Sequence, residues 1–155
     1  MELNQEGIDN GLFFVSLNDG LEEESLKKAA SGGETSRLLL ALKSVLNNLN
    51  PYNCLIFDEI DTGISGRTAQ KVAEKMAYIG RSHQVLCITH LPQIAAYGEQ
   101  HIKVYKQDTD KRTETHIRPL TSEERITEIA TMLSGNTPTP SAIKNAQELI
   151  TAANK

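Results

Sequence analysis

Residues 54–66 read CLIFDEIDTGISG, and the predicted fold is built around this segment. It opens with a continuous apolar run, Cys54–Phe57, which passes directly into two carboxylates. A helix-period pattern follows over residues 67–79, and Gln84–Thr89 is a second apolar run. Such runs are typical of strands buried on both faces of a parallel sheet. Two of them separated by a helix predict a βαβ unit, and so an α/β fold with a mainly parallel sheet flanked by helices.

The segment before this unit predicts a strand and a helix. Residues 12–17 are mostly apolar and end in the turn-forming sequence Asn18-Asp19-Gly20, which indicates a strand. From Glu34 onward, leucines and a valine recur at spacings of three and four, which predicts a helix that Asn50-Pro51 stops.

The segment after it predicts a hairpin and a helical tail. Strands are expected around His101–Tyr105 and Glu114–Ile117, with a polar stretch between them that suggests a hairpin. Further on, Thr121 and Glu124 fit a capping box that begins a helix, and Gly135 ends it. Pro140 suits the first turn of a last helix.

Length and composition exclude several classes of protein. The chain has 155 residues and a formal net charge of −4, which fits one globular domain spanning residues 1–155. No apolar run is long enough to span a bilayer, and no secretory signal pattern is visible. The two cysteines lack CxxC spacing, so a disulfide framework is not indicated and a reducing cytoplasm is expected. Without a dense Lys/Arg cluster, strong binding to a phosphate backbone by this chain alone is not predicted.

Asp58 and Glu59 are the first candidates for chemistry. Unpaired acids at the end of a buried strand are costly, so a structural reason for the pair is hard to find. The carboxyl ends of parallel strands are where α/β sheets bind ligands. One acid can hold a hydrated Mg²⁺ while the other polarises an attacking water, as phosphoryl transfer requires. The alternative is that both acids cap a neighbouring helix, and the third acid, Asp61, makes this less attractive.

Two further clusters are candidates for a functional site because of their positions in the predicted fold. Ser31-Gly32-Gly33-Glu34 directly precedes a predicted helix, whose N-terminus suits an anion such as phosphate. Taken alone, such a stretch is more often a flexible loop with a helix cap. His90 follows the second buried strand, and it would lie beside Asp58 and Glu59 if the two strands are neighbours. An imidazole there can donate a hydrogen bond to a phosphate oxygen.

Three stretches, Ala30–Arg37, Phe57–Gly66 and Ile88–Ala96, together resemble the C-terminal half of the ATPase head in the RecN family. These are bacterial DNA repair and recombination proteins related to the SMC proteins. The resemblance covers nearly the whole chain and implies the C-terminal lobe of a P-loop ATPase head of the ABC/SMC type. It implies ATP and Mg²⁺ as cofactors.

The resemblance also implies roles for the clusters that contact nucleotide and metal. Ser31, Gly32 and Gly33 correspond to the ABC signature motif, which closes over the γ-phosphate of an ATP bound to the opposite head. Glu34 continues this nucleotide-contacting segment, and Asp58 corresponds to the Walker B aspartate that holds Mg²⁺ through water.

The remaining implied roles concern catalysis and the dimer. Glu59 corresponds to the catalytic glutamate that orients or deprotonates the attacking water, and His90 to the switch histidine near the γ-phosphate. Asp61 begins the D-loop, residues 61–66, which reaches across the dimer. The resemblance also implies that Asp61 is one of the nucleotide-binding residues. Arg37 corresponds to a contact made from the signature helix.

One element of the family pattern is missing. The chain contains no G-x-x-x-x-G-K-[ST] motif and no Gly-Lys pair, so the P-loop lysine and its phosphate cradle are absent. No coiled-coil heptads are present either. We therefore expect half of a head, whether excised, split or truncated, which alone hydrolyses ATP hardly at all.

The partners expected from the resemblance are the N-terminal Walker A half of the same head, a second head in a homodimer, and DNA through the full-length protein. No membrane is expected, and the implied location is the cytoplasm, at the nucleoid. The alternative is a non-catalytic fragment that acts only as a dimerisation or interaction module. The nucleotide-binding part of a transporter fits poorly, because the D-loop sequence differs.

Overall fold

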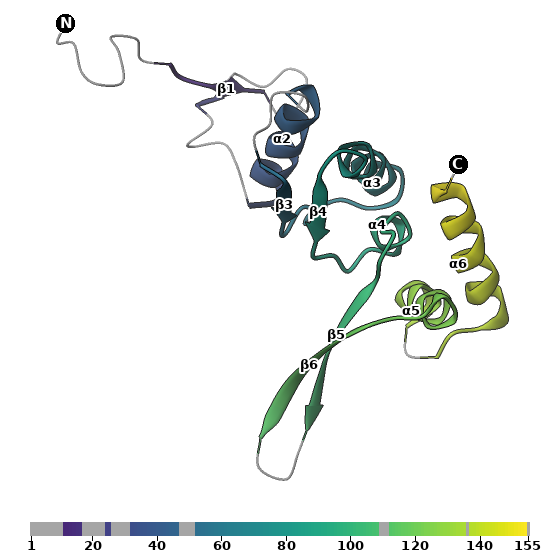
Figure 1. Ribbon diagram of the computed structural model, residues 1–155. Helices are drawn as coiled ribbons and strands as arrows, with labels where there is room; N and C mark the ends of the chain where they lie inside the picture. Colours follow the sequence, from purple (N-terminus) through teal and green to yellow (C-terminus); the bar gives the residue numbers. More distant parts are fainter. Residues whose placement is uncertain are drawn as a thin grey trace, which may run out of the picture.

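The computed structural model describes residues 11–16, 24–25, 32–46, 52–108, 112–135 and 137–154. The elements along the chain are β1 (Phe14–Val15), β2 (Glu24–Ser25), α2 (Gly32–Val45), β3 (Cys54–Phe57), α3 (Gly66–Gly80), β4 (Gln84–Cys87), α4 (Pro92–Ala95), β5 (Ile102–Asp108), β6 (Thr113–Pro119), α5 (Ser122–Ser134) and α6 (Pro140–Ala153), as Figure 1 shows. No helix in these ranges is both long and apolar enough to cross a bilayer.

The predicted βαβ unit is present. β3 and β4 pair in parallel from Cys54 opposite Gln84 to Phe57 opposite Cys87, and α3 connects them. The ladder continues one step beyond the strands, because the Ile88 N–H donates to the Phe57 carbonyl at 3.0 Å. The residues that follow both strands therefore start at the same edge of the sheet.

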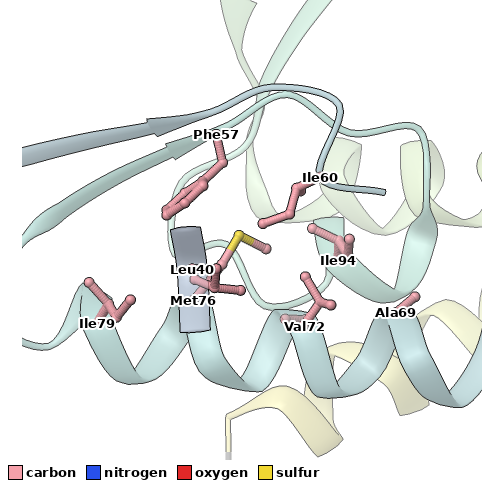
Figure 2. Packing of buried hydrophobic residues seen from close by; sticks show 9 residues of the cluster. Leu40, Phe57, Ile60, Ala69, Val72, Met76, Ile79 and Ile94 are labelled. Carbon is pink, nitrogen blue, oxygen red and sulfur yellow. The ribbon is translucent and has the colours of Figure 1, made fainter. Parts of the chain in front are cut away.

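One face of this sheet packs on the main core, which Figure 2 shows from close by. Phe57 on β3 and Ile60 in the following loop lie over α3, whose Val72, Met76 and Ile79 point toward them. Ile60 and Ile79 are fully buried. Because these side chains recur every three or four residues, α3 presents one apolar stripe to the sheet, as the sequence predicts.

The expectation that β3 and β4 are buried on both faces is wrong for the described residues. The side chains of Ile56 and Leu86 are 67% and 42% exposed, and Ile88 is 63% exposed. Ile56 and Leu86 are register partners, so they share the face turned away from the core. The apolar runs therefore include side chains on a second face of the sheet, and nothing in the described part of the chain covers that face.

The hairpin and the helical tail follow the predicted pattern. β5 and β6 pair antiparallel along seven residues each, and the hairpin projects away from the sheet in Figure 1. A second core forms between α5 and α6, where Ile129, Ala130, Ala142 and Ala146 are buried together with Ala95 and Ala96. The capping box of Thr121 and Glu124 is formed as predicted.

Several predicted bounds differ from the structure. The early strand covers Phe14–Val15 only, and α2 starts at Gly32 and ends at Val45. The stop at Asn50-Pro51 and the turn Asn18-Asp19-Gly20 lie outside the described residues. The short helix α4 was not predicted, because four residues give no periodic signal.

Candidate functional site

The two adjacent carboxylates lie at the carboxyl edge of the β3–β4 sheet. Asp58 and Glu59 directly follow β3, and both residues are exposed. The Glu59 N–H donates to Asp58 Oδ1 at 2.9 Å, which orients the aspartate side chain. Hard oxygen ligands of this kind suit a Mg²⁺ ion that keeps several of its waters. No group of three or more acids, histidines or cysteines is gathered as a metal cage within the described ranges.

Glu59 has an unusual backbone conformation. Its φ of 56° makes it the one non-glycine residue with positive φ among those described. This left-handed region is disfavoured for residues with a Cβ, and strained residues of this kind cluster at functional sites. The turn is held because the Thr62 N–H donates to the Glu59 carbonyl at 3.1 Å.

Helix α2 packs its first turn against the loop that carries the acids. A Cβ on Gly33 would lie 2.9 Å from the carbonyl oxygens of Glu59 and Thr62, so only glycine allows this approach. A Cβ on Gly32 would collide with the Glu59 carboxylate. Gly32 itself is exposed and Gly33 is buried. The close approach brings the helix N-terminus and the acidic loop into one site.

Two side chains of α2 fasten this contact. Arg37 Nη1 donates to the carbonyls of Thr62 at 2.8 Å and Ile60 at 3.2 Å, and Ser36 Oγ donates to the Asp58 carbonyl at 3.0 Å. Of these, only Arg37 was singled out by the sequence. The sequence feature that could have identified Ser36 is its position about one turn after the start of the helix, next to Arg37.

His90 reaches the same edge from β4, as expected for neighbouring strands. Its side chain is 74% exposed, and its Nδ1 lies 3.1 Å from Asp61 Oδ2. Asp61 is 4% exposed, and its Oδ2 also accepts from Thr89 Oγ1 at 2.6 Å and from the His90 N–H at 2.9 Å. Thr89 is a partner that sequence reasoning missed.

Burial by itself would raise the pKa of Asp61. The hydrogen bonds from Thr89 and His90, with the neighbouring imidazole, outweigh burial and hold that pKa below its usual value. Cys87 lies nearby on β4, and burial together with the charges of Asp61 and Asp58 raises the pKa of its thiol to about 12.

The structure thus brings together six of the predicted site residues. These are Gly32, Gly33, Asp58, Glu59, Asp61 and His90. Glu34 is half-buried in the first turn of α2, and Ser31 lies outside the described residues. An exposed acid pair, a helix N-terminus and an exposed imidazole at one sheet edge can together bind a metal-bound phosphate and activate a water.

Comparison with known proteins gives a consistent result, although no protein-family model matches the chain. The DNA repair protein RecN of Bacillus subtilis is 43% identical over 155 residues, which is 100% of this chain and 27% of that protein. RecN of Halalkalibacterium halodurans is 44% identical over 149 residues, covering 96% and 26%. RecN of Deinococcus radiodurans is 46% identical over 144 residues, covering 93% and 25%.

The chain resembles the C-terminal part of RecN. It spans about a quarter of the length of these RecN proteins. Among solved structures, a chain from a study titled "Structural biochemistry of ATP-driven dimerization and DNA stimulated activation of SMC ATPases" matches with a TM-score of 0.52 and 20% identity. The match covers 76% of this chain and 70% of that one. The RecN resemblance and the α/β fold predicted from the sequence are both confirmed.

Proposed function

We propose that this chain supplies the C-terminal half of a RecN-type ATPase head, which hydrolyses ATP where two heads meet. The observation that carries the proposal is the meeting of Asp58, Glu59, His90 and the N-terminus of α2 at one edge of a parallel sheet. A parallel sheet binds ligands at this edge, and these groups are the ones that phosphoryl transfer requires.

In this proposal, Asp58 holds Mg²⁺, and Glu59 orients the attacking water or takes its proton. Bound Mg²⁺ would neutralise charge on the phosphates. The fit rests on two features. The Asp58 carboxylate is exposed, and one of its oxygens is already oriented by the Glu59 N–H at 2.9 Å. The carboxylate of Glu59 is exposed beside it, on a backbone held in an unfavourable conformation.

The signature segment Ser31–Glu34 is proposed to contact the ATP of a second head. Gly32 is exposed at the start of a 14-residue helix, and the dipole of a helix favours an anion at its N-terminus. The hydrogen bonds from Arg37 to the carbonyls of Ile60 and Thr62 connect α2 to the loop that follows the acids.

The partners we propose are the N-terminal Walker A half of the same head, a second head, and DNA through the whole protein. The sequence offers no Gly-Lys pair of its own, so the phosphate cradle has to come from elsewhere. The uncovered apolar face of β3 and β4 is available for packing against that half. A place in the cytoplasm, at the nucleoid, follows from the proposed role in DNA repair.

A chimera tests the proposal. The chain replaces the matching segment of Bacillus subtilis RecN, to which it is 43% identical over 155 residues. The chimera should hydrolyse ATP, and Glu59→Gln should lower turnover by about 100-fold or more, the range expected for a general base. ATP-bound dimers should persist in Glu59→Gln, because the substitution keeps the size of the side chain. ATPase rates and light scattering measure both effects.

Glu148→Gln provides the matched control, since Glu148 is exposed on α6 and pairs only loosely with Lys144 at 4.0 Å. It should leave turnover unchanged. Unaltered hydrolysis in Glu59→Gln contradicts the role of this glutamate. A chimera that dimerises but never hydrolyses ATP supports the second candidate, a non-catalytic interaction module, which the missing Gly-Lys pair favours.

A further inference from the structure

The basic side chains in the described part of the chain differ in whether they have a partner. Most of them contact a carboxylate, a backbone carbonyl or an aromatic ring, and this group includes Arg37, Lys43, Lys103, Arg112, Arg118 and Arg125. The side chains of α3 and its C-cap form no ion pair or hydrogen bond within the described residues. We refer to these as the α3 cations, which are Arg67, Lys71, Lys75 and Arg81.

The α3 cations share one side of the helix. Arg67, Lys71 and Lys75 follow one another at intervals of four residues, and residues at this spacing lie on the same face of a helix. Arg81 is the C-cap residue, and all four cations are exposed. The opposite side of α3 carries the apolar stripe that packs on the sheet, as Figure 2 shows. The cations therefore face away from the core.

One carboxylate lies among the α3 cations but forms no ion pair with them. Glu74 is exposed, and its Oε1 accepts hydrogen bonds from Gln70 Nε2 at 3.2 Å and from Tyr97 Oη at 3.4 Å. Because Tyr97 follows α4, the carboxylate is directed toward the flank of α3 that adjoins α4. This face of the structure keeps an excess of positive charge.

The arrangement is unfavourable for α3 by itself. Like charges four residues apart on a helix repel each other, and a cation in the first turn opposes the helix dipole. Arg67 lies in the first turn, which has no acidic residue. A row of anions bound along the helix would remove both penalties. The charges of α3 are therefore better suited to a bound polyanion than to the free helix.

The spacing of the α3 cations fits a row of phosphates. Four residues of a helix rise by about 6 Å, and two nucleotides of one DNA strand rise by about 7 Å along the duplex axis. Long lysine and arginine side chains can accommodate the difference. In the sequence these cations are spread over residues 67–81, so no dense cluster is visible there. The helix brings them onto one face.

We propose that the α3 cations bind the phosphate backbone of duplex DNA. The choice of DNA among polyanions rests on the proposed role in DNA repair, whereas the excess of positive charge does not. Contacts to phosphates carry no sequence information, so binding should not depend on the DNA sequence. The α3 cations lie on the core side of the sheet, opposite its uncovered apolar face, so packing of another part of the head on that face leaves them accessible.

Fluorescence anisotropy of a labelled DNA duplex tests the proposal in the full chain without nucleotide. Four phosphate contacts should give a slope of log K against log[salt] of about −3.6 between about 50 and 200 mM salt. Lys71→Gln together with Lys75→Gln should bring the slope to about −1.8 and weaken binding about tenfold or more at about 50 mM salt. The melting temperature should not fall, because the two substitutions remove like-charge repulsion.

Lys106→Gln together with Lys144→Gln is the matched control. It makes the same change in net charge at exposed positions on β5 and α6, and it should leave the slope and the affinity unchanged. Equal losses in both pairs of substitutions, or no binding by the unaltered chain at about 50 mM salt, overturn the proposal. Displacement of the DNA by polyglutamate at equal charge concentration assigns this face to an acidic protein and also overturns it.

The chimera with Bacillus subtilis RecN separates a failure of this proposal from a failure of the proposed function. If the chimera hydrolyses ATP while the salt dependence is the same with and without Lys71 and Lys75, the DNA contact of α3 is wrong and the ATPase function stands. A chimera without ATPase activity contradicts the proposed function. DNA binding by the chain, measured without ATP, then still decides the role of the α3 cations.

Discussion

At the scale of single residues, the two cysteines lie in different surroundings, because side chains along a strand alternate between the two faces of a sheet. Cys54 at the start of β3 is exposed, while Cys87 at the end of β4 is turned toward the core and toward two carboxylates. Burial and those charges raise the pKa of Cys87 to about 12, and only the thiolate reacts with alkylating agents.

We therefore expect iodoacetamide at about pH 8 to modify Cys54 and to leave Cys87 intact, as judged by peptide mass spectrometry, because the pKa of the Cys87 thiol is about 12. In urea both thiols should react, since unfolding removes the burial and the neighbouring charges. Equal reactivity of the two thiols in the folded chain would show that Cys87 is not held against the acids.

At the scale of elements, α5 is the helix whose beginning is best defined. Thr121 Oγ1 accepts from the Glu124 N–H at 3.3 Å, and the Glu124 carboxylate accepts from the Thr121 N–H at 2.9 Å. The two bonds satisfy N–H groups that a helix start leaves unpaired. Arg118 Nη1 also donates to Glu124 at 2.8 Å, which links the helix start to β6.

Thr121→Ala should lower the free energy of unfolding by about 1 kcal/mol, the usual cost of losing such a cap. Thr127→Ala is the matched control in the same helix, because Thr127 is exposed and bonds only to the Glu123 carbonyl one turn earlier. Alanine is the better helix former, so the control should be neutral or stabilising. Urea unfolding measures both. An equal loss in both variants contradicts a specific capping role.

At the scale of the whole molecule, the dominant feature is the apolar face of β3 and β4 that the described residues leave uncovered. Ile56, Leu86 and Ile88 are exposed on this face, while Val104 and Ile117 are 62% and 68% exposed on the β5–β6 hairpin, which is a separate sheet. Apolar side chains gathered on one face of a sheet mark an interaction site. The chain also spans about a quarter of its RecN relatives, which agrees with the proposal that another part of the head covers this face.

We expect Ile56→Thr to change the free energy of unfolding of the chain by less than about 0.5 kcal/mol, as at most surface positions. It should reduce binding of a hydrophobic dye and weaken assembly with a separately produced N-terminal part of RecN. Ile79→Thr makes the same chemical change at a fully buried position and should cost several kcal/mol. Undiminished assembly of Ile56→Thr with the N-terminal part would argue that this face is not the contact.

The sequence by itself predicted the order of the longer elements and indicated where a site would lie. Apolar runs and helical periodicity specified β3, α3 and β4, because local patterns report which faces of an element avoid water. Asp58, Glu59 and His90, together with Gly32 and Gly33, were predicted as site residues for a related reason, since such groups at strand and helix ends seldom serve packing. Thr121 and Glu124 were readable because a capping box is local.

Tertiary structure decided what depends on residues far apart in the chain. The bond of Thr89 to Asp61 spans 28 positions, and the contact of Arg37 with Thr62 spans 25, so neither leaves a periodic trace. The left-handed backbone of Glu59 is imposed by the loop around it. Whether Ile56 is exposed depends on which elements pack on its face of the sheet. An apolar run in the sequence is equally compatible with one covered face or two.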